Sequence, residues 1–347
     1  MSKIKKLMCA DSYCEQILLF VHLAANRKRR MSNTLASLVV SLLLTSLLMA
    51  QQAINAELWA ADWKWADGKE LSNKEQCCQY CLIEFPNVNL GLIHLYKYVP
   101  IIQVTINGHP VRLLLDTGST YTVIDQAAAK EFGLKEQEGG EGEFAFGDQK
   151  FTVAKLQQLD LGSCSTNNMD VAVQDLSKLK WLDEKLAGLL GLDVLGSFAV
   201  TVDYRKKLIE LSPKVFPLAK NAIVLPCHSD DWGRLWLSGN IDNANNTSDM
   251  LVDTGCDFSS ISESTVSKII RKPLVIWKSV QDGAGVEEHC YHHTFKKLII
   301  NDISFDKPKF AVTCDTQSDT TLGANFLRKY RITLDFPGKR LILEPYP

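Results

Sequence analysis

From Tyr98 onward, short apolar runs alternate with turn residues, as is typical of β structure. Ile101–Ile106 has the pattern of a strand, Asn107-Gly108 that of a two-residue hairpin turn, and Val111–Leu115 that of the returning strand. One short helix is expected over Asp125–Phe132. This part of the chain is therefore predicted to be all-β.

The N-terminus has a different pattern. Lysines at positions 3, 5 and 6 and a basic run at 27–30 precede an uncharged, apolar stretch at 35–50. About 16 residues are short for a spanning helix but suit the core of a signal peptide. We expect residues 1–56 to direct export to the periplasm or the extracellular space, and 35–50 to be either cleaved off or kept as a membrane anchor. Met31 is an alternative start of the chain.

An internal repeat divides the rest of the chain. LLLDTGST at 113–120 returns as MLVDTGCD at 250–257, and LLGLDVLGSFAVTVDY at 189–204 returns as TLGANFLRKYRITLDF at 321–336. The two signals of each copy are spaced alike, because Gly191 lies 75 residues after Asp116 and Gly323 lies 70 residues after Asp253. The chain is therefore predicted to hold two similar lobes.

A single Asp-Thr-Gly is often only a surface turn, since Asp and Gly favour turns. Two copies would arise by chance in only about 0.3% of chains this long. Three apolar residues also precede each of Asp116 and Asp253, which places both carboxylates at the ends of buried strands. We therefore interpret the two Asp-Thr-Gly motifs as parts of a functional site and not as surface turns.

These motifs resemble the lobe of the retropepsin-like aspartic proteases, in which apolar-apolar-Asp-Thr-Gly precedes a second apolar-apolar-Gly motif. The resemblance covers Tyr98 to Pro347 and occurs twice. It implies two tandem lobes, at 94–216 and 217–347, with an active site at their junction that one chain completes. Residues 57–93 are expected to be a linker or a small appendage.

The resemblance assigns a role to each motif residue. Asp116 and Asp253 would be the catalytic pair, and Thr117 and Thr254 would hydrogen-bond across the lobe junction. Ser119 is expected to hydrogen-bond the carboxylate of its own lobe, where the second lobe has the weaker donor Cys256. The remaining support residues are glycines that allow close backbone approach or back the active-site loops: Gly118, Gly255, Gly191 and Gly323.

Two adjacent carboxyls that share one proton can activate a water and polarise a peptide carbonyl. The predicted function is thus that of an aspartic endopeptidase without cofactor or metal. Its partner would be an extended peptide or protein substrate. Glycine-containing segments at 139–146 and 282–287 are expected to be mobile flaps.

Composition adds limits to this interpretation. A hydrophobic fraction of 46% and a net charge of −2 fit a globular protein and argue against nucleic acid as a partner. Of ten cysteines, Cys77, Cys78 and Cys81 cluster before the first lobe, where the compartment favours disulfides or thiols over a metal site.

Three alternatives stay open. The chain could be a non-catalytic peptide- or envelope-protein-binding module that kept the fold. It could also be a membrane-tethered assembly factor that acts through residues 57–91. The cluster at His289, Cys290, His292 and His293 could hold a metal, although surface positions or a Cys290–Cys314 disulfide are favoured.

Overall fold

The computed structural model describes residues 63–65, 78–82, 98–144, 147–162, 164–242, 248–270, 278–281, 287–314 and 319–347. The chain divides into two units, Met1–Ala60 and Ala61–Pro347, and every described residue lies in the second. The predicted leader and its apolar stretch at 35–50 thus lie outside the described residues. Within the described part, no helix is long and apolar enough to cross a membrane.

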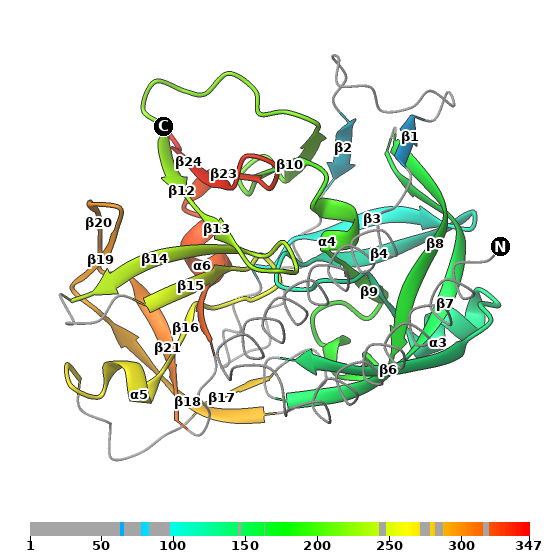
Figure 1. Ribbon diagram of the computed structural model, residues 1–347, viewed down its shortest axis with the longest axis horizontal. Coiled ribbons are helices and arrows are strands. Elements are labelled where there is room, and N and C mark those ends of the chain that lie inside the picture. Colours follow the sequence, from blue (N-terminus) through cyan, green and yellow to red (C-terminus); the bar gives the residue numbers. More distant parts are fainter. Residues whose placement is uncertain are drawn as a thin grey trace, which may run out of the picture. The chain divides into compact units, whose positions relative to one another are not determined.

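The N-terminal lobe is an eight-stranded sheet in the order β1-β8-β5-β9-β4-β3-β7-β6 (Figure 1). It closes into a barrel-like form because β7 and β8 also pair with each other. Its strands are β1 (Trp63–Trp65), β3 (Ile101–Ile106), β4 (His109–Leu115), β5 (Val123–Asp125), β6 (Gln137–Phe144), β7 (Gly147–Leu161), β8 (Cys164–Gln174) and β9 (Leu186–Leu190). Its helical segments are α3 (Gln126–Glu131), η1 (Ser177–Leu179) and α4 (Leu192–Leu195).

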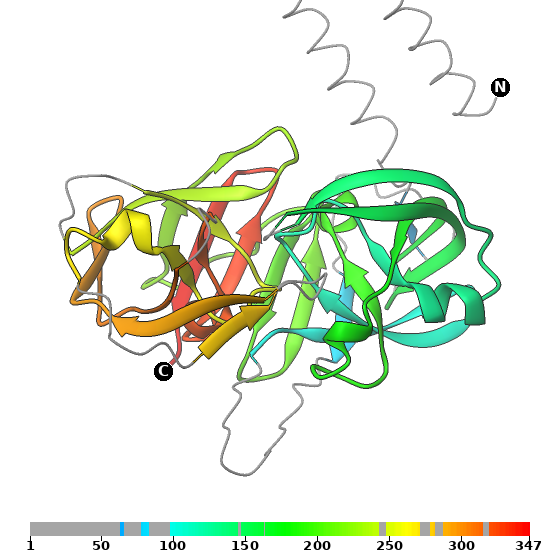
Figure 2. The same cartoon turned by 90° about the horizontal axis from the view of Figure 1, so that it is seen from below.

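The C-terminal lobe is a ten-stranded sheet in the order β17-β18-β21-β16-β22-β15-β14-β19-β20, with β13 paired to β14. Its strands are β13 (His228–Ser229), β14 (Leu235–Ile241), β15 (Ser248–Val252), β16 (Ser260–Ser262), β17 (Lys278–Gln281), β18 (Glu287–Thr294), β19 (Lys297–Ile300), β20 (Ile303–Asp306), β21 (Lys309–Thr313) and β22 (Thr320–Leu322). Its helices are α5 (Glu263–Val266) and α6 (Ala324–Leu327). Figure 2 shows the cyan-to-green first lobe beside the yellow-to-red second lobe.

The two lobes repeat one topology. In the first, β4 runs parallel to β9 and β5 parallel to β8, while β5 and β9 are antiparallel. In the second, β15 runs parallel to β22 and β16 parallel to β21, while β16 and β22 are antiparallel. The predicted all-β fold of two similar lobes is confirmed.

A third sheet joins the lobes, in the order β12-β24-β23-β10-β11-β2. Its strands are β2 (Cys78–Leu82), β10 (Ala199–Asp203), β11 (Leu208–Ser212), β12 (Ile223–Pro226), β23 (Tyr330–Asp335) and β24 (Arg340–Pro345). The lobes meet where β10 pairs antiparallel with β23, with Thr201 opposite Thr333. The short strands β1 and β2 come from the predicted appendage, and they extend the first barrel and this shared sheet.

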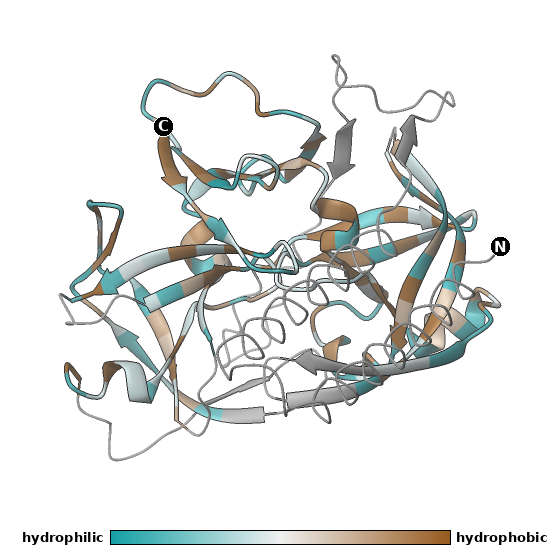
Figure 3. Cartoon of the chain, viewed as in Figure 1, coloured by the Kyte–Doolittle hydropathy of each residue, from teal (hydrophilic) through white to brown (hydrophobic). Residues whose placement is uncertain are grey.

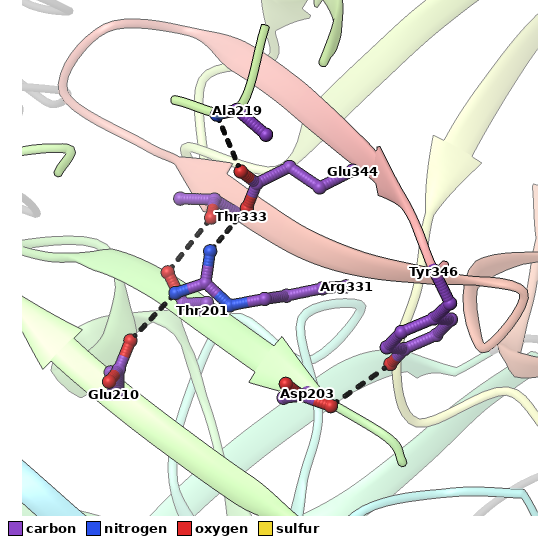
Figure 4. Close-up of polar contacts among 8 residues, drawn as sticks. All are labelled: Thr201, Asp203, Glu210, Ala219, Arg331, Thr333, Glu344 and Tyr346. Atoms are coloured by element: carbon purple, nitrogen blue, oxygen red, sulfur yellow. Dashed lines mark hydrogen bonds and ion pairs between the residues drawn. The ribbon is translucent and has the colours of Figure 1, made fainter. Parts of the chain in front are cut away.

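One face of the shared sheet packs into the main apolar core through alternate residues of each strand, such as Val200, Val202, Ile332 and Leu334. In Figure 3, brown and teal segments alternate along many of the described strands. The other face carries a polar network in which Arg331 binds Glu210 of the first lobe and Glu344 of the second (Figure 4). The shared sheet is thus held by apolar packing on one face and by ion pairs on the other.

The elements expected from the local pattern are also present. β3 spans the predicted 101–106, and Asn107 and Gly108 both have positive φ, as the tight hairpin turn requires. The expected helix is α3, which Asp125 precedes. The Asp125 carboxylate accepts the Leu176 N–H at 3.0 Å and pairs with Lys180 at 3.1 Å, so it ties the start of α3 to the segment that follows β8.

Candidate active site

Each motif Asp lies just after a strand of its own barrel. Asp116 follows β4, and its N–H donates to the Leu190 carbonyl at 3.0 Å. Asp253 follows β15, and its N–H donates to the Leu322 carbonyl at 3.2 Å. The parallel partner strand thus fixes the backbone of each Asp in the same way.

The structure brings the Asp116 and Asp253 carboxyls together from the two lobes, and they hydrogen-bond to each other. Asp116 Oδ1 also accepts the N–H groups of Gly118 and Ser119, at 2.9 and 3.1 Å. Asp253 Oδ1 accepts the Gly255 N–H at 2.7 Å. Main-chain donors therefore orient both carboxyls toward the junction.

Each motif glycine faces the carboxyl of the opposite lobe. A Cβ on Gly118 would lie 2.6 Å from Asp253 Oδ2, and one on Gly255 would lie 2.4 Å from Asp116 Cγ. Both distances are far below van der Waals contact, so any side chain would force the carboxyls apart. Glycine at these two positions is what allows the pair to form.

The pair is electrostatically strained. Burial raises the pKa of Asp116 well above its ordinary value, and the negative charge of Asp253 raises it further. Burial also raises the pKa of Asp253, against the lowering effect of the N–H donors around it. Because two like charges this close cannot both form readily, the pair retains one proton at pH values where an ordinary carboxyl is ionised.

Thr117 and Thr254 interlock beneath the carboxyls, and both are fully buried. The Thr117 hydroxyl donates to the Val252 carbonyl at 2.9 Å, and the Thr254 hydroxyl donates to the Leu115 carbonyl at 2.7 Å. Each hydroxyl also accepts the N–H of the other threonine, at 3.0 and 3.3 Å. Each loop is thus bonded to the strand end that carries the opposite Asp.

The expectation for the Ser119 side chain was wrong. Its hydroxyl donates to the Tyr121 carbonyl at 2.8 Å, and only its N–H reaches Asp116. The Cys256 thiol makes the matching contact to the Phe258 carbonyl at 3.2 Å. A hydroxyl on Cβ is near the carbonyl two residues on when the loop turns this tightly, so both side chains brace their loop and not the carboxyl.

The repeated glycine segments back the two loops. Gly191 precedes α4 and lies against the Tyr121 carbonyl, while Gly323 precedes α6 and lies against the Cys256 carbonyl. The first N–H groups of α4 donate to the Ser119 and Thr120 carbonyls, at 2.9 and 3.1 Å. Those of α6 donate to the Cys256 and Asp257 carbonyls, at 2.8 and 3.1 Å.

Sequence reasoning missed one further support in each lobe. Asp193 accepts both the N–H and the hydroxyl of Thr122, at 2.9 and 2.8 Å. Asn325 Oδ1 accepts the same two groups of Ser259, each at 2.7 Å. The signal was present, because a hydroxyl residue follows the Asp of each Asp-Thr-Gly motif by six positions, and an Asp or Asn follows each repeated glycine by two.

The expected flaps fall on two hairpins. Of the first expected flap, residues 139–144 lie in β6, which pairs with β7, and of the second, Glu287 is the first residue of β18, which pairs with β17. Residues 145–146 and 282–286 lie outside the described residues.

The histidine cluster has its own contacts on β18. The His292 ring stacks on Phe258 at 4.4 Å, and His293 meets Phe295 edge-on at 4.7 Å. Cys290 and Cys314 do not form a disulfide with each other, so the predicted bridge is wrong. The ladder pairs Cys290 with Thr313, the last residue of β21, and the N–H of Cys314 donates to the His289 carbonyl at 3.0 Å, so Cys314 lies opposite His289 and not opposite Cys290. Among the described residues, no group of His, Cys, Asp and Glu is placed to hold a metal ion.

Two hydrogen-bonded carboxyls between two β lobes are the arrangement of an aspartic protease. A family model described as aspartyl protease matches residues 102–194 and 237–326, which together make up more than half of the chain. The chain belongs to this family of retropepsin-like aspartyl proteases, and the two matches coincide with its two lobes. No curated protein sequence matches the chain.

Proposed function

We propose that the protein is an aspartic endopeptidase in which Asp116 and Asp253 act as the catalytic pair. The observation that carries the proposal is the mutual hydrogen bond of two carboxyls with raised pKa values, held by main-chain donors. A module that only bound peptides would gain nothing from keeping two like charges in contact, because the pair costs folding energy.

The chemistry follows from the shared proton. The ionised carboxyl takes a proton from a water held between the two groups, and the resulting hydroxide bonds to the peptide carbonyl carbon. The protonated carboxyl donates its proton to the carbonyl oxygen, which stabilises the tetrahedral intermediate. When the C–N bond breaks, the leaving nitrogen takes a proton from one carboxyl, and one hydroxyl of the tetrahedral intermediate returns its proton to the other carboxylate as the carbonyl of the acid re-forms. The free acid and the free amine are released, and the pair again holds one proton.

The support residues keep this geometry. Thr117 and Thr254 bond the two loops to each other, and Gly118 and Gly255 allow the two carboxyls to come into contact. The remaining residues that support the loops are Ser119, Cys256, Gly191 and Gly323. Because both lobes come from one chain, we propose that the site needs no second copy. The β6–β7 and β17–β18 hairpins would close over an extended peptide, which binds through its main chain.

We also propose that the protein works outside the cytoplasm, directed there by residues 1–56. A disulfide at Cys164 supports this proposal, because such bonds persist in oxidising compartments. Residues 35–50 would then either be removed or hold the protein at the membrane.

Cleavage of a diverse peptide mixture by the full chain tests the proposal, with products identified by mass spectrometry from acidic to neutral pH. Asp116→Asn and Asp253→Asn are each expected to lower the cleavage rate by about 1,000-fold or more. Asp170→Asn, at a surface ion pair with Lys155, is the matched control and should cleave as wild type. Near wild-type cleavage by a folded Asp116→Asn protein would refute the assignment and favour the binding module.

A further inference from the structure

A tryptophan of the second lobe contacts the loop that carries Asp116. Trp232 lies in the hairpin loop between β13 and β14 of the C-terminal lobe, and 47% of it is exposed. Of the described large apolar side chains, it is the most exposed. Its ring meets Tyr121 of the N-terminal lobe edge-on, with the ring centroids 6.4 Å apart. Trp232 thus reaches across the junction to the loop that carries Asp116.

The hairpin loop is built to hold this position. The Asp230 carboxylate accepts the N–H groups of Trp232 and Arg234, both at 3.0 Å. It also accepts Arg234 Nε at 2.6 Å and Trp236 Nε1 at 3.0 Å. Gly233, with φ of 83°, closes the turn. One carboxylate with four donors fixes the loop, so little entropy is lost when Trp232 makes a contact.

The backbone of Tyr121 is also held in place, five residues after Asp116. Ser119 folds the loop back, because its N–H bonds to Asp116 and its hydroxyl bonds to the Tyr121 carbonyl. A peptide in extended form advances about 3.3 Å per residue. A chain centred on the carboxyl pair therefore reaches Tyr121 within a few residues of the cleaved bond.

The corresponding position of the second lobe has a different contact. The counterpart of Tyr121 is Phe258, whose ring is covered by His292 of its own lobe at 4.4 Å and 4° between the ring planes. The carboxyl pair is nearly symmetric, but the aromatic side chains beside it differ between the lobes. The asymmetry gives a bound peptide a preferred direction.

We propose that Trp232 and Tyr121 form the contact surface for a bulky apolar side chain of the peptide substrate, with Trp232 as a specificity-determining residue. The inference rests on the proposed endopeptidase function. A tryptophan offers a large apolar surface at low entropic cost, and aromatic contacts favour other rings and long aliphatic chains. The substrates are therefore peptides with Phe, Tyr, Leu or Met at one fixed position near the cut.

The test uses quenched fluorogenic peptides built on one cleaved sequence, in which each position near the cut in turn carries Phe, Leu, Ala or Asp. Wild type should show, at one position, a kcat/KM for Phe or Leu well above that for Ala. Trp232→Ala should reduce this ratio about 5- to 10-fold, since an aromatic contact is worth about that much. Trp232→Phe should restore most of it. Trp181→Ala, which removes another exposed tryptophan outside the active-site loops, should leave the ratio unchanged.

The failures of the two proposals are distinguishable. If the wild-type protein cleaves, Asp253→Asn does not, and Trp232→Ala keeps the wild-type ratio at every position, the inference about Trp232 is overturned and the endopeptidase stands. If cleavage persists in Asp253→Asn, the proposed function fails and the inference fails with it. An equal loss of the ratio in Trp181→Ala also overturns the role of Trp232.

Discussion

The hydroxyl groups of Thr201 and Thr333 share one hydrogen bond, with their oxygens 2.8 Å apart, at the centre of the sheet that joins the lobes (Figure 4). The two residues are the same position of the two sequence repeats, each ten residues after the repeated glycine. The approximate twofold axis of the molecule therefore passes between them. The axis that relates Thr201 to Thr333 also relates Asp116 to Asp253, so the shared sheet sets the geometry in which the carboxyls meet.

The interlock under the carboxyls predicts a stability defect in Thr254→Val. The substitution keeps the shape but leaves the buried Leu115 carbonyl and Thr117 N–H without their hydroxyl partner. We expect the free energy of unfolding to fall by about 1–3 kcal/mol, as measured by urea denaturation. Thr254→Ser keeps the hydroxyl and is the control. Equal stability of the Val and Ser variants would show that the interlock contributes nothing.

The buried carboxyl of Asp193 should make the free energy of unfolding depend on pH. Burial raises its pKa to about 7, so between about pH 4 and pH 7 the folded state binds more protons than the unfolded state. The free energy of unfolding contributed by Asp193 therefore falls as pH rises through this window and is level above it. Asp193→Asn should match wild type near pH 4 and be more stable at pH 8 by up to about 4 kcal/mol, since the pKa of Asp193 lies about three above the ordinary value.

The second lobe supplies the mirror-image control for Asp193. Asn325→Asp places a carboxyl at the equivalent position, where the oxygen accepts the Ser259 N–H and hydroxyl. Asn325→Asp should lower the free energy of unfolding at pH 8 and leave it nearly unchanged at pH 4. Melting temperatures measured from pH 4 to pH 8 test this prediction. If the melting temperatures of both variants and wild type change with pH in parallel, the raised pKa of Asp193 is not the cause of the pH dependence.

Cys256 is predicted to be inert in the folded protein. Burial raises the pKa of its thiol well above the ordinary value, and the charge of Asp253 raises it further, so the reactive thiolate is scarce at neutral pH. Iodoacetamide should label Cys256 far more slowly in the native than in the unfolded protein, as followed by peptide mass mapping. Cys256→Ser should cleave peptides within about threefold of wild type, because a hydroxyl can replace the thiol bond to the Phe258 carbonyl. Rapid native labelling, or loss of activity in Cys256→Ser, would be inconsistent with a bracing role.

The network around Arg331 predicts a second stability effect. Arg331→Ala removes the partner of Glu210 and of Glu344, the latter a buried residue that also accepts the Ala219 N–H at 2.9 Å. The unpaired glutamate should lower the free energy of unfolding by about 1–3 kcal/mol. Lys155→Ala breaks the more exposed pair with Asp170 and should cost less than about 0.5 kcal/mol. Indistinguishable denaturation curves for these two variants would rule out a structural role for the network.

The sequence by itself determined the elements whose signals are local or repeated. Alternation defined β3, Asn107-Gly108 defined its turn, and the duplicated Asp-Thr-Gly and glycine segments defined two β lobes. These succeed because strand periodicity, turn chemistry and internal repetition are written in neighbouring residues.

Only the tertiary structure decided the contacts between distant residues. Arg331 binds Glu210, which lies 121 positions earlier, and the Thr201 hydroxyl meets that of Thr333, which lies 132 positions later. Trp232 carried no sequence signal, because its meaning comes from Tyr121 in the other lobe. Such contacts depend on how two lobes pack around a common axis, and the packing of residues more than 100 positions apart is not encoded in any local pattern.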